Sequence, residues 1–112
     1  HQNFKQVLLD AREKDITLMK SPVGYPARGV RTNLHGLIDT RTGPAIKCIS
    51  NCVAPCNRGV EAKEVGFCIA DRLSDAYFGD LELGLFFSGS NGYRIDKIIS
   101  VKELMEKLTQ GE

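Results

Sequence analysis

The chain has 112 residues, enough for one small domain, and its 42% hydrophobic and 26% charged residues are the mix of an ordinary soluble globular protein. The net charge is +1, and 15 basic residues are spread among 14 acidic ones, so the sequence has no concentrated basic face for nucleic acid or an anionic membrane. No segment reaches the ~18 consecutive apolar residues of a membrane span, and no signal peptide is recognisable. We therefore expect a cytoplasmic protein that binds neither nucleic acid nor membrane.

The N-terminal region carries a helical pattern almost from its first residue. Apolar residues between Phe4 and Ala11 recur at i, i+3, i+4 and i+7, which predicts an amphipathic helix over residues 3–14. The chain begins at His1 rather than at a methionine. Two interpretations remain open, a processed or expressed piece and the C-terminal part of a longer gene product, and we favour the second.

The next segments alternate short apolar runs with loops. Residues 16–19 read as a short buried strand, and residues 20–29 as a shaped loop, because two prolines and two glycines exclude a regular helix there. Residues 30–47 show no clear period. His35 lies in this region without a nearby carboxylate or second histidine, so we expect a surface or loop histidine rather than a catalytic base.

The second half predicts two helices around a strand-like run. The first helix spans about residues 61–78 and ends at Gly79, a natural C-terminal stop. An apolar run at 83–87 is followed by a small-residue turn at 88–92, and a capping box opens a last helix that ends near Leu108. An independent α/β domain would show several βα alternations, so these few strands indicate part of an architecture whose sheet lies elsewhere.

The cysteines form one constellation, Cys48-x3-Cys52-x3-Cys56-x11-Cys68. Four thiolates can bind tetrahedral zinc or an iron–sulfur cluster, but this spacing matches neither a zinc ribbon nor the common ferredoxin patterns. Three interpretations remain open at this point: a metal site, structural thiols without a ligand, and a disulfide or redox switch.

The other polar candidates lie in the two glycine-containing loops. Arg28 can clamp a phosphate or carboxylate, or can pin loop carbonyls, and Ser21 is a candidate polar contact. The segment 88–94 can present backbone N–H groups to an anion or can be a plain turn. No nucleophile triad, HExxH motif or carboxylate pair is present, so the chain has no evident general base of its own.

Three stretches together resemble the nitronate monooxygenase family, formerly called 2-nitropropane dioxygenases. They are KSPVGYPAR at 20–28, the cysteine segment ending in GFCIA at 66–70, and LFFSGSNGYRIDKI at 85–98. Their order and spacing are similar to the C-terminal end of that family, and the similarity is greatest to a cysteine-containing branch.

The resemblance implies an α/β fold class, with the chain as the C-terminal fragment of a (β/α)8 TIM barrel, made mostly of helices and loops with few short strands. Residues 1–14 would be the last barrel helix. Residues 15–112 would cover the barrel mouth and include a Cys-rich loop at 48–68. The implied cofactor is FMN, the implied reaction is oxidation of an alkyl nitronate with O2, and the implied partners are that small-molecule substrate and the remainder of the barrel.

The resemblance also implies which residues lie near cofactor or substrate. Matches to the family's loop and turn are Ser21, Gly24, Arg28, Ser88, Gly89 and Asn91. The family's catalytic histidine and the segments that hold the FMN phosphate have no match, so we expect no catalytic residue in this chain. Alternatives are a flavin-dependent enoyl-acyl-carrier-protein reductase, a non-catalytic module whose four cysteines hold zinc or iron–sulfur, and a free-standing interaction domain.

Overall fold

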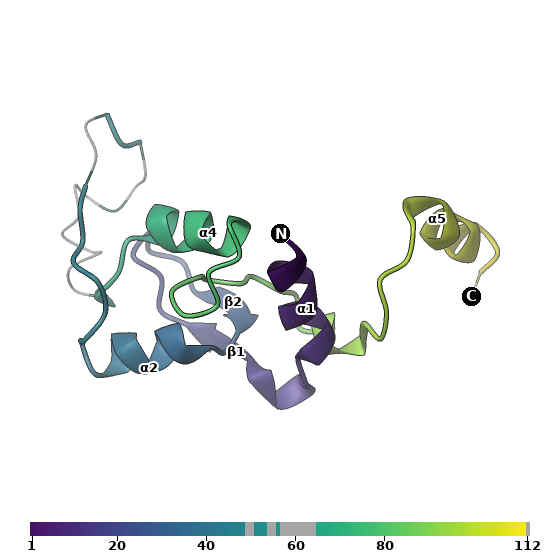
Figure 1. The fold of residues 1–112 in the computed structure, drawn as a ribbon, viewed down its shortest axis with the longest axis horizontal. Helices are drawn as coiled ribbons and strands as arrows, with labels where there is room; N and C mark the ends of the chain where they lie inside the picture. Colours follow the sequence, from purple (N-terminus) through teal and green to yellow (C-terminus); the bar gives the residue numbers. More distant parts are fainter. Residues whose placement is uncertain (49–50, 54–55, 57–64, 112) are drawn as a thin grey trace.

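The computed structural model of the chain describes residues 1–48, 51–53, 56 and 65–111, and these residues form a small α/β unit (Figure 1). Short helices predominate and the strands are few, which confirms the predicted fold class. The elements in chain order are α1 (Gln2–Asp10), the 3-10 helix η1 (Glu13–Asp15), β1 (Ile16–Met19), β2 (Ala27–Val30), α2 (Asn33–Asp39), α4 (Ile69–Tyr77), the 3-10 helix η3 (Gly92–Arg94) and α5 (Val101–Thr109).

A two-stranded hairpin lies at the centre of the fold. Strands β1 and β2 pair antiparallel, with Met19 opposite Ala27. A third segment runs beside β2, because the Val30 N–H donates to the Phe86 carbonyl at 2.9 Å. Glycine is required at position 29, since a Cβ there would lie 2.5 Å from the Phe86 oxygen. The predicted strand at 16–19 is confirmed, but it is not buried as expected: no residue in it is fully buried, and Leu18 is 61% exposed. The strand-like run at 83–87 makes only an isolated bridge.

Two apolar clusters hold the helices against this hairpin, and Figure 1 shows α4 and α2 on opposite sides of it. The aromatic rings of Phe4 and Phe86 meet edge to face at 4.9 Å, which docks α1 on the segment beside β2. Burial of such side chains stabilises the fold by about 1.5–3 kcal/mol each. The buried residues are Ala11, Val30, Ala76 and Phe86 in one cluster and Leu34, Phe67 and Leu85 in the other.

The ends of the helices follow local rules. Helix α4 ends in a Schellman motif, in which the Gly79 N–H donates to the Ala76 carbonyl at 3.1 Å and the Asp80 N–H donates to the Asp75 carbonyl at 2.9 Å. Gly79 has φ of 85°, a left-handed conformation that glycine adopts without steric cost, so it is the predicted stop. At the start of α5, the Ser100 hydroxyl oxygen accepts from the Glu103 N–H, as its sequence indicates.

Four sequence-based assignments differ from the structure. Helix α1 ends at Asp10 because Ala11 is extended, with ψ of 133°. Strand β2 begins at Ala27, inside the predicted loop. Helix α2 lies within 30–47, where no regular element was expected. A seven-residue helix is not stable by itself, and burial of Leu34 at its start provides the missing stabilisation. The helix predicted at 61–78 is described only from residue 65, and within that part α4 begins at Ile69.

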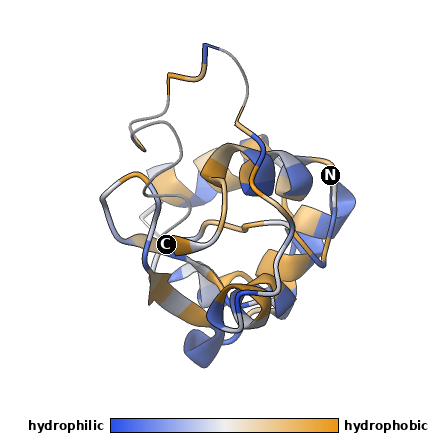
Figure 2. Cartoon of the chain, turned by 90° about the vertical axis from the view of Figure 1, so that its left-hand side faces the viewer, coloured by the Kyte–Doolittle hydropathy of each residue, from blue (hydrophilic) through white to orange (hydrophobic). Residues whose placement is uncertain are grey.

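Helix α5 lies apart from the other elements (Figure 1), and the molecule measures 48 × 29 × 23 Å. Its apolar side chains recur at i, i+3, i+4 and i+7 and remain exposed; they are Val101 (76%), Leu104 (44%), Met105 (52%) and Leu108 (64%). Figure 2 shows that the helices carry both hydrophobic and hydrophilic residues, as amphipathic helices do. Among the described helices, none is long and apolar enough to span a membrane.

Candidate functional site

An open pocket of about 560 Å³ lies where the loop after β1, strand β2 and the segment after Phe86 meet. It brings together four of the six residues that the sequence indicated, from loops far apart in the chain. Most of its surface is apolar. The lining residues are Ser21, Val23, Tyr25, Pro26, Ala27, Arg28, Ile69, Phe87, Ser88 and Gly89.

The loop that supplies Ser21 is fixed by a turn. Ser21 is only 5% exposed, and its hydroxyl oxygen accepts a hydrogen bond from the Val23 N–H at 3.2 Å. The Ser21 carbonyl accepts from the Gly24 N–H at 3.4 Å, which closes the turn around Pro22. Because proline fixes its own φ, this loop holds the serine with little freedom. No described residue accepts a hydrogen bond from the Ser21 hydroxyl, and the residue lines the pocket.

Arg28 and Ser88 meet across the strand edge. The Ser88 N–H donates to the Arg28 carbonyl at 3.2 Å, next to the bridge between Gly29 and Phe87. The Arg28 side chain is exposed at the pocket, and no described residue forms an ion pair with it. The Ser88 hydroxyl donates to the Gly89 carbonyl at 3.1 Å. The pocket therefore offers one unpaired guanidinium beside apolar walls.

Two predicted residues lie outside this pocket. Gly24 lines a neighbouring pocket of about 430 Å³, to which Ser21 also contributes. Asn91 is exposed and precedes η3, where its carbonyl accepts from the Arg94 N–H at 3.0 Å. Sequence reasoning missed Phe87 and Ile69 as lining residues, because it read them only as parts of the apolar run at 83–87 and of the helix at 61–78.

The pocket contains one cation and no acidic or histidine side chain among the described lining residues. It can therefore bind an anion through Arg28 and orient it through hydroxyl groups. Among the same described lining residues, no side chain is suited to accept a proton from carbon at neutral pH.

His35 lies in a different environment from the one predicted. It is 4% exposed and lies in α2, so the prediction of a surface or loop histidine was wrong. Its Nδ1 accepts a hydrogen bond from the Thr32 N–H at 3.0 Å. His35 thus occupies the third helical position, where a capping box usually has glutamate or glutamine. The signal that could have revealed the helix is thus Thr32 followed three residues later by a side-chain acceptor.

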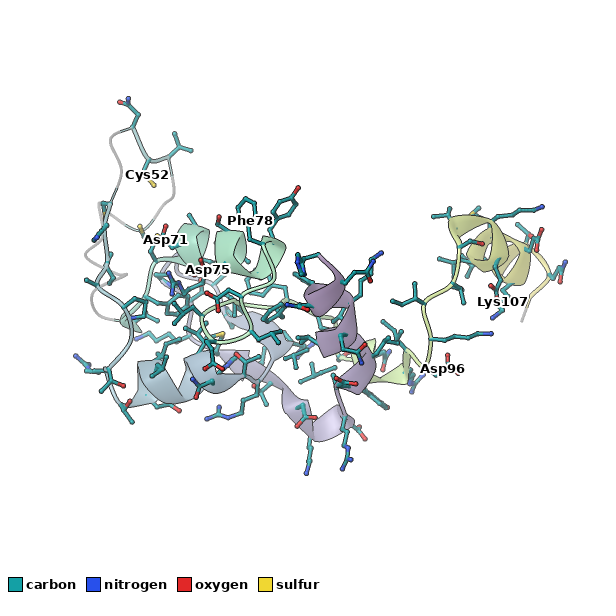
Figure 3. The ribbon with its side chains drawn as sticks, in the orientation of Figure 1. Cys52, Asp71, Asp75, Phe78, Asp96 and Lys107 are labelled. Carbon is teal, nitrogen blue, oxygen red and sulfur yellow. The ribbon has the colours of Figure 1, made fainter. Side chains whose placement is uncertain are left out.

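The cysteines do not converge in the described part of the chain. All four are free thiols: Cys48 and Cys52 are exposed, Cys56 is buried and Cys68 is half-buried at the N-terminal end of α4. Figure 3 shows Cys52 on a loop that stands away from the helices. Within residues 1–48, 51–53, 56 and 65–111, no three His, Cys, Asp or Glu side chains are placed to hold a metal. The zinc or iron–sulfur prediction is therefore not supported.

Comparisons with known proteins agree with the family resemblance. Four chains of solved structures match; one is FabK from Thermotoga maritima, with a TM-score of 0.68 and 24% sequence identity over 98% of this chain and 30% of that chain. The chain thus spans about 30% of the length of that relative. No curated protein sequence matches. The sequence model of nitronate monooxygenase matches residues 1–111, and the chain therefore belongs to the nitronate monooxygenase family.

Proposed function

We propose that this chain is part of an FMN-dependent oxidoreductase that oxidises an alkyl nitronate with O2, and that its pocket supplies one wall of the substrate site. The observation that carries the proposal is the convergence of Ser21, Arg28, Ser88 and Gly89 on one pocket. Membership of the family supports the reaction class. The chain spans 30% of FabK, so the activity belongs to a longer protein.

The chemistry of the pocket suits a small anion with an alkyl tail. An alkyl nitronate carries its negative charge on the nitro oxygens, and the Arg28 guanidinium can donate two parallel hydrogen bonds to such a pair. The apolar side chains of Tyr25, Phe87 and Ile69 provide contacts for the alkyl group. Burying that group contributes about 0.8 kcal/mol per CH2, so each methylene that the pocket covers strengthens binding.

The described residues fit one side of a flavin but not its phosphate. Apolar and aromatic lining suits the uncharged ring, whereas Arg28 would be the single cationic partner for a phosphate in this pocket. When bound, FMN supplies the acceptor for the electrons of the substrate. We place its phosphate site and the catalytic base on the longer protein outside this chain. Here Ser21 and Arg28 orient the substrate, and Phe87 excludes water.

The exposed surfaces support the proposed position in a barrel. We assign α1 to the last barrel helix and residues 15–112 to the segment that covers the barrel mouth, where active sites of this fold lie. The exposed apolar face of α5 and the exposed rings of Tyr77 and Phe78 are surfaces that a larger protein would bury. Phe78 points outward from the end of α4 in Figure 3.

The test uses the full-length protein, its flavin absorbance and the kinetics of nitronate oxidation. Arg28→Ala should raise KM for an alkyl nitronate about tenfold or more with FMN content unchanged, because a charge-assisted hydrogen bond contributes about 1.5–3 kcal/mol. Lys5→Ala, which removes an exposed charge on α1, is the matched control. An unchanged KM in Arg28→Ala would contradict the role of the pocket. Turnover of an enoyl thioester without nitronate oxidation would assign the reductase alternative.

A further inference from the structure

A cationic pocket of about 330 Å³ lies between the end of β1 and helix α2. It shares no lining residue with the candidate site, so the inference drawn from it does not rest on the proposed function. Three cations line it, Lys20, Arg31 and Arg41, against one carboxylate. That carboxylate, of Asp39, lies 3.1 Å from the Arg31 guanidinium. The charge of the lining is therefore positive by two.

His35 lines the same pocket, and its tautomer is determined by two independent features. The Thr32 N–H donates to Nδ1, so Nδ1 carries no proton. Burial, and then the neighbouring charge of Arg31, lower the pKa of His35 from its ordinary value, so the ring is neutral at pH 7. The one imidazole proton therefore lies on Nε2. This buried N–H has no acceptor among the described residues, an unusual state for a buried donor.

Arg41, which also lines this pocket, has an unusual backbone conformation. Helix α2 ends in the same Schellman motif as α4: the Arg41 N–H donates to the Ile38 carbonyl at 3.1 Å, and the Thr42 N–H donates to the Leu37 carbonyl at 2.9 Å. Helix α4 uses a glycine at this left-handed position, but α2 uses Arg41, with φ of 55°. An arginine there is strained relative to glycine, and it adds a guanidinium to the pocket.

We propose that this pocket binds a small oxyanion, a phosphate or carboxylate group, which Lys20, Arg31 and Arg41 neutralise while the His35 Nε2–H donates to one of its oxygens. An oxyanion supplies the acceptor that the buried imidazole lacks and the negative charge that the three cations lack. Since Arg31 and Arg41 are exposed and have long side chains, they can close over an anion that enters beside His35.

Arg41→Gly separates binding from folding, because its two expected effects have opposite signs. Glycine relieves the left-handed strain, so the melting temperature of the full-length protein should rise by about 2 °C or more. Loss of the guanidinium should weaken binding of inorganic phosphate about tenfold, measured by calorimetric titration at constant ionic strength. Lys102→Ala on α5 makes the same change in net charge outside the pocket and should leave the phosphate affinity unchanged.

The imidazole gives the direct readout. In protein labelled with 15N-histidine, the Nε2–H resonance that His35→Gln removes should shift on addition of inorganic phosphate or of acetate. A shift with phosphate alone identifies a phosphate group as the ligand, and a shift with acetate alone identifies a carboxylate. The proposal is overturned if neither anion shifts the resonance. It is also overturned if Arg41→Gly binds phosphate as tightly as the Lys102→Ala control and the unchanged protein do.

Discussion

Gly29→Ala should detach the segment beside β2, because this glycine is where two backbones come closest. The new Cβ would lie 2.5 Å from the Phe86 oxygen and 3.3 Å from its carbonyl carbon, and both are backbone atoms that cannot rotate away. The two hydrogen bonds nearest this contact, Val30 N–H to Phe86 and Ser88 N–H to Arg28, contribute about 0.5–1.5 kcal/mol each. With partial loss of Phe86 burial, the free energy of unfolding should fall by about 2–4 kcal/mol.

Urea denaturation followed by circular dichroism measures this loss. With a slope of about 1–3 kcal/mol per molar urea, the midpoint should fall by about 0.7 M or more. Gly36→Ala is the control: a Cβ at this position in α2 meets no atom within 4 Å, and alanine favours a helix over glycine by about 1 kcal/mol. The midpoint of the control should rise. Equal midpoints for Gly29→Ala and the unchanged protein would refute the packing argument.

Three further results are expected. His35 has a pKa lowered by burial, so the unfolded chain binds its proton more tightly; stability should fall as pH drops below about 6.5, and His35→Phe should flatten urea midpoints measured between pH 7 and pH 5. Leu108→Ser should leave the stability of this chain within about 0.5 kcal/mol but destabilise the full-length protein by more than about 1 kcal/mol, as thermal unfolding of both would reveal. Cys52 is an exposed free thiol, and no three described His, Cys, Asp or Glu side chains are placed to hold a metal, so Cys52→Ser should not change the melting temperature with or without a chelator; a metal-dependent loss would restore the metal hypothesis.

Local signals predicted the elements whose causes are local. The strand at 16–19 is an uninterrupted apolar and β-branched run between a charged stretch and a proline loop. The stop at Gly79 and the cap at Ser100 each depend on one residue within one turn of a helix. These features need no knowledge of distant segments, so a single sequence contains them.

The missed elements depend on tertiary contacts. Helix α2 has seven residues with a glycine inside, too short and too weak to form alone, and it exists because Leu34 is fully buried against a cluster that includes Phe67 and Leu85. Strand β2 begins inside a loop rich in proline and glycine because the segment after Leu85 pairs with it. No periodicity within residues 27–39 reports partners more than 30 positions away.

In the candidate site, too, local patterns predicted the individual residues but not the contact between the loops that carry them. Ser21 and Arg28 were found because they belong to a loop with a recognisable family pattern, and Ser88 and Gly89 because they belong to another. That the two loops meet follows from the approach of Phe86 to Gly29, which no local pattern contains. The buried state of His35 was missed although its partner is local: the Thr32 backbone N–H, three residues earlier, donates to its ring.

Steady-state oxidation of an alkyl nitronate by the full-length flavoprotein, measured as oxygen consumption, tests the proposed role of the pocket when Arg28→Ala is assayed beside it. We expect a yellow protein that turns over the nitronate, and an Arg28→Ala variant that keeps its flavin but has a KM raised about tenfold or more. A protein that binds no flavin, or a variant whose KM equals that of the unchanged enzyme, would contradict the proposal.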